Sequence, residues 1–449
     1  MGLFGTDGVR GLANKDLTAE LALDLSVAAA HVLADAGVFA GHRPRAIVGR
    51  DTRASGEFLE AAVVAGLASA GIDVTLVGAL PTPAIAFLVA HTDSDLGVML
   101  SASHNPMPDN GIKFFARGGH KLDDSLEAAI EARMREPWDR PTGAGVGRVN
   151  MDPDAGSVFI AHLLSTLPAD ASFAGLKVVV DCANGAASVV GPEALRRAGA
   201  DVIAIHATPN GLNINEGCGS THLEDLRAAV VEHGADLGIA FDGDADRCLA
   251  VDHQGNDVDG DHILGILAIA KSEEGSLVNN TVVSTVMANL GFNQAMDSIG
   301  IHVVATAVGD RYVLEEMRTN GYTLGGEQSG HVVMTEFGTT GDGILTALHL
   351  LQRVTRSGST LATLAGVVNK MPQILINVPN VDRDALESNE RIAAEVALLE
   401  DAMDGSGRIL LRPSGTEPVI RVMVEAESEV AAQRVAEQLA RVITAELAL

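Results

Sequence analysis

The segment 101–115, SASHNPMPDNGIKFF, places Ser103 directly before His104 in a loop rich in glycine and asparagine. Such a serine could be a hydrolase nucleophile, a carrier of a transferred group or a turn residue. Successive side chains point apart along an extended or loop backbone, so we expect His104 to be poorly placed to take the serine proton. No G-x-S-x-G elbow surrounds Ser103, which also disfavours a serine hydrolase.

The segment 242–247, DGDADR, spaces three aspartates two residues apart, at Asp242, Asp244 and Asp246. On an extended backbone they would share one face, at steps of about 7 Å between Cα atoms. A ligand set made only of oxygen selects a hard cation, and Mg²⁺ fits best. A calcium EF-hand would need Gly at the sixth loop position and Glu at the twelfth, where this chain has Arg247 and His253.

A second aspartate run, NDVDGDHILGILAIA, has the same spacing at Asp257, Asp259 and Asp261. It precedes an apolar stretch of helical character, where aspartate serves as an N-cap and as a partner of the helix dipole. Spacing alone therefore does not separate a metal site from a helix start or a turn. The position of DGDADR directly after the apolar run DLGIAF favours the metal site.

Other loops carry side chains that suit a phosphorylated polyol. RPSGTEP, residues 412–418, offers a guanidinium, two hydroxyls and backbone N–H donors, and Arg421 follows it. This combination fits a phosphate dianion, with a Pro-Gly turn as the alternative. GGEQSGH, residues 325–331, sets Glu327 and Ser329 between glycines, which let a backbone approach a ligand closely.

Two candidate residues carry little weight alone. FGTDGVRG, near the N-terminus, contributes Arg10 in a glycine-flanked loop, with turn chemistry as the alternative. A lone histidine such as His331 is more often a structural residue than an acid or a base.

The elements that must position these loops form one pattern three times. Residues 44–84, 176–211 and 280–317 each read as strand, helix and strand. A further strand then precedes each polar loop: DLGVML before SASHN, DLGIAF before DGDAD, and YTLG before GEQSGH. Short apolar runs that alternate with amphipathic helices predict α/β cores with helices on both faces of the sheets. Because ligands collect at the carboxyl ends of strands in open sheets, the three loops could face one cleft.

The chain from about residue 370 differs, because two strand-like runs flank RPSGTEP and an amphipathic helix closes the sequence. This pattern predicts a smaller α+β domain with an antiparallel sheet. A length of 449 residues predicts about three domains and permits four. We place the boundaries near 155, 255 and 368, which gives domains at 1–155, 156–255, 256–368 and 369–449.

Composition limits the class of protein. The chain is 47% hydrophobic, its apolar stretches fall short of a membrane span, and its first residues lack signal-peptide character, so we expect a cytoplasmic protein. A net charge of -28 argues against nucleic acid or an anionic membrane as a partner. A phosphorylated substrate would need locally gathered cations, each worth about 4 kcal/mol at 4 Å for an effective dielectric near 20.

The three cysteines, Cys182, Cys218 and Cys248, are widely spaced and include no Cys-x-x-Cys pair. Their odd number and their spacing suggest neither a disulfide framework nor a zinc site. We expect buried thiols.

Taken together and in this order, FGTDGVRG, SASHNPMPDNGIKFF, DGDADR, GGEQSGH and RPSGTEP resemble the α-D-phosphohexomutase superfamily. The resemblance runs from Phe4 to Arg421, and five ordered motifs are far more specific than any one of them. The FGTDGVRG opening, GIKFF after the serine loop and Gln328 favour the bacterial branch that acts on glucosamine phosphates. Phosphomannomutase/phosphoglucomutase relatives commonly have Met at the position of Gln328.

The resemblance implies a fold and a reaction. The fold would be α/β in four domains around a central cleft, three with a shared mixed-sheet core and a fourth, α+β domain like the TATA-box-binding protein. The reaction would interconvert glucosamine 6-phosphate and glucosamine 1-phosphate, for UDP-N-acetylglucosamine and cell-wall precursor synthesis. Ser103 would carry the phosphate, a 1,6-bisphosphate would be the intermediate, and Mg²⁺ would be held by the phosphoserine with Asp242, Asp244 and Asp246.

The resemblance also assigns roles to other residues. Lys113, with His331 assisting, is the favoured acid and base. The other residues expected near the transferred phosphate are Arg10, His104 and Arg247. The residues expected to bind the sugar are Thr306, Gly309, Asp310, Glu327 and Ser329. The residues expected to bind the second phosphate are Arg412, Ser414, Gly415, Thr416 and Arg421.

Two alternatives remain open. The same chemistry could act on mannose or glucose phosphates, or the chain could be a non-catalytic sugar-phosphate binding protein. The serine loop beside an acidic triad argues against a pure binder, which has no use for a nucleophile. We expect a hexosamine phosphate as substrate, no nucleic acid or membrane partner, and either a monomer or a homodimer.

Overall fold

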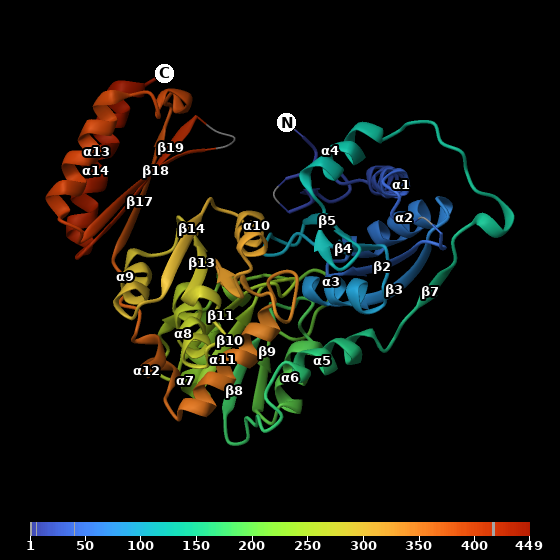
Figure 1. Cartoon of the computed structure of the whole chain (residues 1–449), viewed down its shortest axis with the longest axis horizontal. Helices are drawn as coiled ribbons and strands as arrows, with labels where there is room; N and C mark the ends of the chain where they lie inside the picture. The colour runs from blue at the N-terminus through green and yellow to red at the C-terminus, as the bar shows by residue number, and fades with distance from the viewer. Residues whose placement is uncertain (1, 6, 40, 415–417) are drawn as a thin grey trace. The chain divides into compact units, whose positions relative to one another are not determined.

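The computed structural model describes the whole chain except residues 1, 6, 40 and 415–417. The chain divides into two compact units, one made of 1–287 with 301–367 and one made of 288–300 with 368–449. The course of the chain can be followed in Figure 1. Among the described helices, none is both long and apolar enough to cross a bilayer.

The first sheet of the larger unit is mixed, in the order β1-β5-β4-β2-β3-β7, with β6 beside β5. Its strands are β1 (Val9–Leu12), β2 (Arg45–Arg50), β3 (Asp73–Ala79), β4 (Leu96–Leu100), β5 (Asp109–Ala116), β6 (His120–Lys121) and β7 (Val149–Met151). Its helices are α1 (Ala19–Asp35), α2 (Ser55–Ser69), α3 (Thr82–His91) and α4 (Asp124–Arg133), with a short 3₁₀ turn at Gly143–Gly145.

Helices cover both faces of this sheet, as two successive residues of β2 show. Val48 belongs to the buried core that α1 and α2 share. The next residue, Gly49, faces the opposite side, where a Cβ atom would meet Ile85 of α3. Successive side chains of a strand point to opposite faces, so a continuous apolar run is buried on both. β4 is buried along its whole length and delivers the serine loop at its carboxyl end.

The second sheet has the order β12-β11-β10-β8-β9, with β8 parallel to both β9 and β10. Its strands are β8 (Lys177–Asp181), β9 (Asp201–Ile205), β10 (Leu237–Phe241), β11 (Cys248–Asp252) and β12 (Asp257–Val258). The helices of this part are α5 (Ala155–Ser165), α6 (Val190–Arg197) and α7 (Glu224–His233), with a 3₁₀ turn at Gly219–Thr221.

The third sheet has the order β14-β13-β15-β16, and only β16 runs antiparallel to its neighbour. Its strands are β13 (Thr281–Thr285), β14 (His302–Thr306), β15 (Leu324–Gly326) and β16 (Val332–Met334). The helices of this part are α8 (Gly260–Glu273), α10 (Asp310–Asn320), α11 (Gly343–Ser357) and α12 (Leu361–Ala365), with a 3₁₀ turn at Val278–Asn280. Asp259 caps α8 by accepting from the His262 N–H, which confirms its predicted role.

The smaller unit contains an antiparallel sheet in the order β17-β19-β18. Its elements are α9 (Leu290–Ser298), β17 (Gln373–Pro379), a 3₁₀ turn at Arg383–Ala385, α13 (Glu390–Met403), β18 (Gly407–Pro413), β19 (Val419–Ala426) and α14 (Glu429–Leu447). α14 packs its apolar face on the sheet, through residues such as Leu439 and Ile443. The three α/β cores with mixed sheets and the antiparallel C-terminal sheet confirm the predicted fold class. The domain boundaries at 155, 255 and 368 stay a prediction.

Candidate active site

The serine loop leaves the carboxyl end of β4, and one buried arginine holds its backbone. Arg53 has no solvent exposure. Its Nη2 donates to the carbonyl oxygens of Ser103 and Asn105, at 3.0 and 2.8 Å. Its Nη1 donates to the carbonyls of residues 106 and 109, and its Nε donates to Asp51. A planar guanidinium with five N–H donors can satisfy several converging carbonyls at once, which an ammonium cannot.

A second support for the loop comes from an asparagine. Asn215 donates its amide to the same two carbonyls, of Ser103 and Asn105, at 2.9 and 3.0 Å. The Ser103 N–H donates to the Ser101 hydroxyl, which in turn donates to Asp51. Sequence reasoning missed Arg53, Asp51 and Asn215. The available indication was that Asp51 ends the predicted strand AIVGRD and that Arg53 comes two residues later.

The expectation for His104 is wrong in its geometry. Ser103 has a left-handed backbone, with φ of 51°, so the alternation of an extended chain does not apply. The Ser103 Oγ and the His104 Nδ1 lie 3.2 Å apart. Burial, together with the charge of Arg247, lowers the pKa of His104 to about 4, so the imidazole is neutral near pH 7. The serine hydroxyl donates to the Asp242 carboxylate at 2.6 Å.

The acidic triad forms a turn after β10 and departs from the extended conformation expected. Ala245 has φ of 55°, which folds the segment back on itself. One carboxylate oxygen from each of Asp242, Asp244 and Asp246 lies within 4.8 Å of the others, and all three side chains are buried. The turn therefore gathers the carboxylates more tightly than steps of about 7 Å along a strand would allow.

The triad fits a hard divalent cation. Burial and the two neighbouring carboxylates raise the pKa of Asp242 well above its usual range. For Asp246 burial also acts upward, but the positive charges of His331, Lys113 and Arg247 outweigh it and lower the pKa. Among the described residues, the buried Asp244 Oδ1 and Asp246 Oδ1 have no hydrogen-bond partner. Buried carboxylate oxygens without a hydrogen-bond partner are suited to a metal ion.

Lys113, on β5, links the acidic triad to a second carboxylate, that of Asp7. Its ammonium is 2.7 Å from Asp244 and 2.7 Å from Asp7. Burial opposes the charge of Lys113, but Asp244 and Asp7 outweigh it and raise the pKa. Asp7 also accepts from Arg10 at 2.6 Å and from Lys121 at 2.6 Å. Sequence reasoning missed Asp7 and Lys121, although FGTDGVRG contains the aspartate.

Arg247 and His331 also reach the triad. The side-chain Nε of Arg247 lies 3.9 Å from Asp246. The backbone N–H of Arg247 donates to the Asp242 carboxylate. The His331 Nδ1 lies 3.6 Å from Asp246, and its Nε2 lies 3.7 Å from Asp310. Burial lowers the pKa of His331, but those carboxylates outweigh it and raise the pKa. The structure thus brings the predicted catalytic residues of three sheets together in the larger unit.

The predicted sugar-binding residues lie beside this group. Glu327 accepts from the Gly309 N–H at 3.2 Å, and Asp310 forms an ion pair with Lys121. In the described part of the chain, the buried Ser329 hydroxyl has no hydrogen-bond partner, so it is available to a ligand. The Thr306 hydroxyl donates to backbone carbonyls instead, at 3.0 and 3.3 Å.

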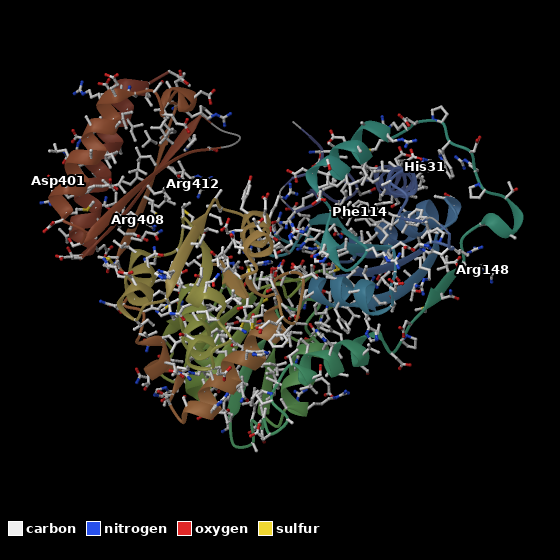
Figure 2. All side chains as sticks on the ribbon, in the orientation of Figure 1. His31, Phe114, Arg148, Asp401, Arg408 and Arg412 are labelled. Carbon is white, nitrogen blue, oxygen red and sulfur yellow. The ribbon has the colours of Figure 1, made fainter. Side chains whose placement is uncertain are left out.

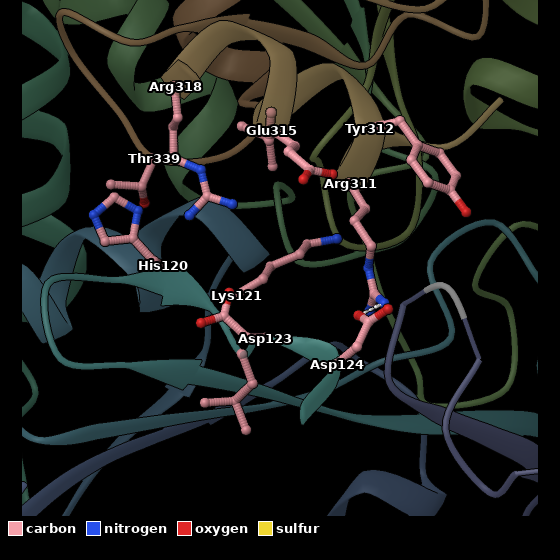
Figure 3. A pocket seen from close by; sticks show the side chains of 11 residues that line it. His120, Lys121, Asp123, Asp124, Arg311, Tyr312, Glu315, Arg318 and Thr339 are labelled. Atoms are coloured by element: carbon pink, nitrogen blue, oxygen red, sulfur yellow. Dashed lines mark ion pairs between the residues drawn. The ribbon is translucent and has the colours of Figure 1, made fainter. Parts of the chain in front are cut away.

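A cavity of about 240 Å³ opens next to Lys121. Figure 3 shows its lining side chains, with Lys121, Asp123 and Asp124 on one part of the chain and Arg311, Tyr312 and Arg318 on another. An Arg311–Asp124 ion pair spans the two parts. The cavity shares Lys121 with the cations of the site, but none of the triad aspartates lines it.

The predicted phosphate loop belongs to the smaller unit. Arg412 on β18 and Arg421 on β19 are register partners, so both side chains lie on the same face of the sheet. Figure 2 labels Arg408 and Arg412 along β18. Ser414 is buried, and its carbonyl accepts from Arg383, a cation that sequence reasoning missed. Gly415 and Thr416 lie outside the described residues.

Comparison with known proteins identifies the family. Models of phosphoglucomutase/phosphomannomutase match the chain at residues 1–139, 157–255 and 259–371 for alpha/beta/alpha domains I, II and III, and at 375–442 for the C-terminal domain. The chain therefore belongs to the phosphoglucomutase/phosphomannomutase family. The predicted resemblance is confirmed.

Individual relatives narrow the comparison. A phosphoglucosamine mutase of a Nocardioides species is 63% identical over 100% of this chain and 99% of the relative. A phosphoglucosamine mutase of Streptomyces avermitilis is 64% identical over 99% of each chain. The two relatives align with 99–100% of this chain, so the similarity extends to all four matched segments.

Solved structures share the fold at lower identity. A phosphoglucomutase/phosphomannomutase family protein from Burkholderia thailandensis has a TM-score of 0.80 and 24% identity, over 100% of this chain and 99% of that chain. An N-acetylphosphoglucosamine mutase from Aspergillus fumigatus, solved with GlcNAc-6P and magnesium, has a TM-score of 0.67 and 18% identity, over 99% of this chain and 96% of that chain.

Proposed function

We propose that this chain is an intramolecular phosphotransferase that interconverts glucosamine 6-phosphate and glucosamine 1-phosphate. The observation that carries the proposal is the Ser103 hydroxyl, which donates at 2.6 Å to Asp242 of an acidic triad. Lys113, Arg247 and His331 pair with the other two aspartates of that triad. Full-length relatives at 63–64% identity, named phosphoglucosamine mutase, support the substrate. The product would serve the synthesis of UDP-N-acetylglucosamine and cell-wall precursors.

Ser103 is proposed to carry the phosphate between two positions of the sugar. A hydroxyl of the sugar monophosphate attacks the phosphorus of phosphoserine, the bond to the Ser103 oxygen breaks, and a 1,6-bisphosphate forms. After the bisphosphate turns over, the Ser103 oxygen attacks the other phosphate, and the product leaves. Such transfer depends on in-line positioning and charge compensation. Arg53 and Asn215 support the positioning, because they fix the carbonyl of Ser103 itself.

The acidic triad is the proposed place for Mg²⁺, held by Asp242, Asp244, Asp246 and the phosphoserine. When bound, the ion neutralises charge on the phosphoryl oxygens. The magnesium of the Aspergillus fumigatus structure supports this choice of metal.

Lys113 is the proposed acid and base. Its raised pKa keeps the ammonium charged near neutral pH, so it also compensates negative charge on the transferred phosphate. His331 assists, and Arg10, Arg247 and His104 complete the surroundings of the transferred group. Glu327 and Ser329, with Thr306, Gly309 and Asp310, are proposed to hold the sugar. Arg412, Ser414, Gly415, Thr416 and Arg421 are proposed to hold the second phosphate.

The experiment that tests the carrier role is intact mass spectrometry. We expect a fraction of the wild-type protein to carry one added phosphate, and we expect Ser103→Ala to abolish both this species and turnover. Ser165→Ala is the matched control, because it removes an exposed hydroxyl at the end of α5 and keeps the carrier. A wild-type protein that never carries phosphate, and that a bisphosphate sugar cannot load, would leave the proposal without a mechanism.

The choice of sugar is tested separately. Initial rates with glucosamine, glucose and mannose phosphates should give the highest kcat/KM for glucosamine phosphate. A preference for mannose or glucose phosphate would keep the mechanism and change the substrate. Cytoplasmic location and a monomeric or homodimeric state remain our expectations.

A further inference from the structure

A second group of metal-ligating side chains lies outside the proposed active site. One ligand atom from each of Asp181, His206 and Cys218 lies within 4.8 Å of the others. Asp181 ends β8, His206 directly follows β9, and Cys218 precedes a 3₁₀ turn. Because β8 and β9 are parallel, their carboxyl ends meet at one edge of the sheet, where such sheets bind ligands.

We propose that Asp181, His206 and Cys218 bind a divalent transition cation, Zn²⁺ being the best fit. The set combines one oxygen, one nitrogen and one sulfur. Thiolate and imidazole ligands select borderline and soft cations, whereas the oxygen-only triad selects hard ones. The chain would therefore have two metal sites that differ in the metal they prefer.

The distances are close to those of a loaded site. The His206 Nδ1 lies 3.1 Å from the Asp181 Oδ2. Tetrahedral zinc with bonds of about 2.0–2.3 Å holds its ligand atoms roughly 3.3–3.8 Å apart. From the limit of 4.8 Å, the sulfur would need to approach by about 1.5 Å at most to reach this range. Three protein ligands leave a fourth position for water.

The surroundings support a metal-binding orientation of the ligands. The Asp181 carboxylate accepts from the Ala183 and Gly219 N–H groups, each at 2.9 Å, which fixes it in place. The far nitrogen of His206, Nε2, lies 3.2 Å from Asp225. A histidine that binds metal through one nitrogen commonly donates its other N–H to a carboxylate, and Asp225 supplies that carboxylate.

The exposure of these residues and their chemistry also favour a bound cation. Asp181 and Cys218 are fully buried, while the His206 side chain is 26% exposed and Asp225 is 64% exposed. A cation can therefore enter past His206. On binding it would replace the thiol proton of Cys218, which would pass to solvent, and a neutral His206 would bind through Nδ1 with its proton on Nε2.

Sequence spacing could not suggest this site, because its residues are far apart and lack a Cys-x-x-Cys pair. Its position has a consequence for the serine loop. Asn215, three residues before Cys218, donates to the Ser103 carbonyl. A cation that ties the Cys218 loop to the ends of β8 and β9 would stiffen this support.

The test is titration of the full-length protein with Co²⁺ in the presence of excess Mg²⁺. Thiolate coordinated to Co²⁺ absorbs in the near ultraviolet, and the oxygen-only triad has no sulfur. We expect one equivalent of this absorption in the wild type, its loss in Cys218→Ala, and its retention in Cys248→Ala, which removes another buried thiol. Zn²⁺ should displace the Co²⁺ and bleach the band.

His206→Asn provides a second variant in case Cys218→Ala does not fold. His206 has φ of 44°, a left-handed conformation that asparagine tolerates well. We expect at least a tenfold weaker Co²⁺ affinity for this variant. A wild type without the thiolate band, a band that survives Cys218→Ala, or an unchanged affinity in His206→Asn overturns the proposal. None of these results bears on mutase activity, which is measured separately with Mg²⁺.

Discussion

At the scale of single residues, the reactive serine is defined by its backbone as much as by its side chain. Ser103 has a left-handed φ of 51°, which turns its hydroxyl to both His104 and Asp242. A left-handed conformation costs an L-residue about 1 kcal/mol or more, so the surroundings must hold it. The sign of φ cannot be read from a serine in a polar loop, and the expectation for His104 therefore failed.

Arg53 is the residue that holds this conformation, and Arg53→Lys tests it. An ammonium cannot reach four carbonyl oxygens and Asp51, so several buried acceptors would lose their partner. We expect kcat to fall by about 10² while KM changes less than threefold, because the loop carries the transferred group. Steady-state kinetics with glucosamine phosphate measure both values.

The matched control is Arg43→Lys, which changes an arginine paired with Asp73 at the surface. Its activity should stay within twofold of the wild type, because exposed ion pairs contribute little. Circular dichroism establishes that both variants are folded. A kcat for Arg53→Lys equal to that of the control would show that the loop needs no such support.

At the scale of elements, the sequence predicted most of what positions the site. Alternation of apolar runs and amphipathic helices predicted the parallel strand pairs, and each predicted strand end delivers its polar loop. The triad was expected on an extended segment, but a turn at Ala245 gathers it instead. Local sequence did not reveal that turn because alanine has no special preference for a positive φ.

Helix α11 begins at the edge of the site with a buried acid. Asp342 caps the helix by accepting from the Leu345 N–H at 2.9 Å. Burial raises the pKa of the Asp342 carboxyl to about 7, from an ordinary value of about 3.9. Because the folded pKa is raised, the folded state binds the proton more tightly. Stability is therefore lost as pH rises between about 4 and 7.

Asp342→Asn should remove the loss of stability between about pH 4 and pH 7, because the amide does not ionise. Its side-chain oxygen can still cap the helix. We expect the variant's free energy of unfolding, relative to the wild type, to rise by about 1–3 kcal/mol between pH 5 and pH 8. Urea denaturation with EDTA, which keeps the acidic triad free of metal, measures it. Ser428→Asn, at the cap of α14, exchanges one uncharged cap for another, so its effect should not depend on pH. A pH-independent difference for Asp342→Asn would contradict the prediction.

At the scale of the whole molecule, the sequence predicted four segments, whereas contacts divide the chain into two compact units. Residues 288–300 pack with the C-terminal residues. Asn289 donates to Glu425 at 3.1 Å, and the Leu290 N–H donates to the same carboxylate at 3.0 Å. Arg408 pairs with Glu425 as well. The periodicity of apolar residues predicts whether a segment is a helix or a strand. It does not predict which segment, more than a hundred residues away, packs against it.

Two units with separate apolar cores should respond separately to core mutations. Leu439 lies in the core of the smaller unit and Leu67 in a core of the larger, and both are fully buried. A buried Leu→Ala change costs about 2–5 kcal/mol. We expect Leu439→Ala to speed hydrogen exchange in β17, β18 and β19 and to leave β2, β4 and β5 unchanged. Leu67→Ala should do the reverse.

Exchange monitored by mass spectrometry in mild denaturant resolves these strands. The reciprocal pair of variants is its own control, because each removes the same three side-chain carbons from a different core. If each unit opens without the other, the free energy of opening of a unit depends on its own core. Each variant then accelerates exchange only in the unit that contains the substitution. If both variants accelerated exchange equally in both sets of strands, the chain would unfold as one cooperative body. In that event the Asn289, Arg408 and Glu425 contacts would belong to a single core and would not define a separate unit.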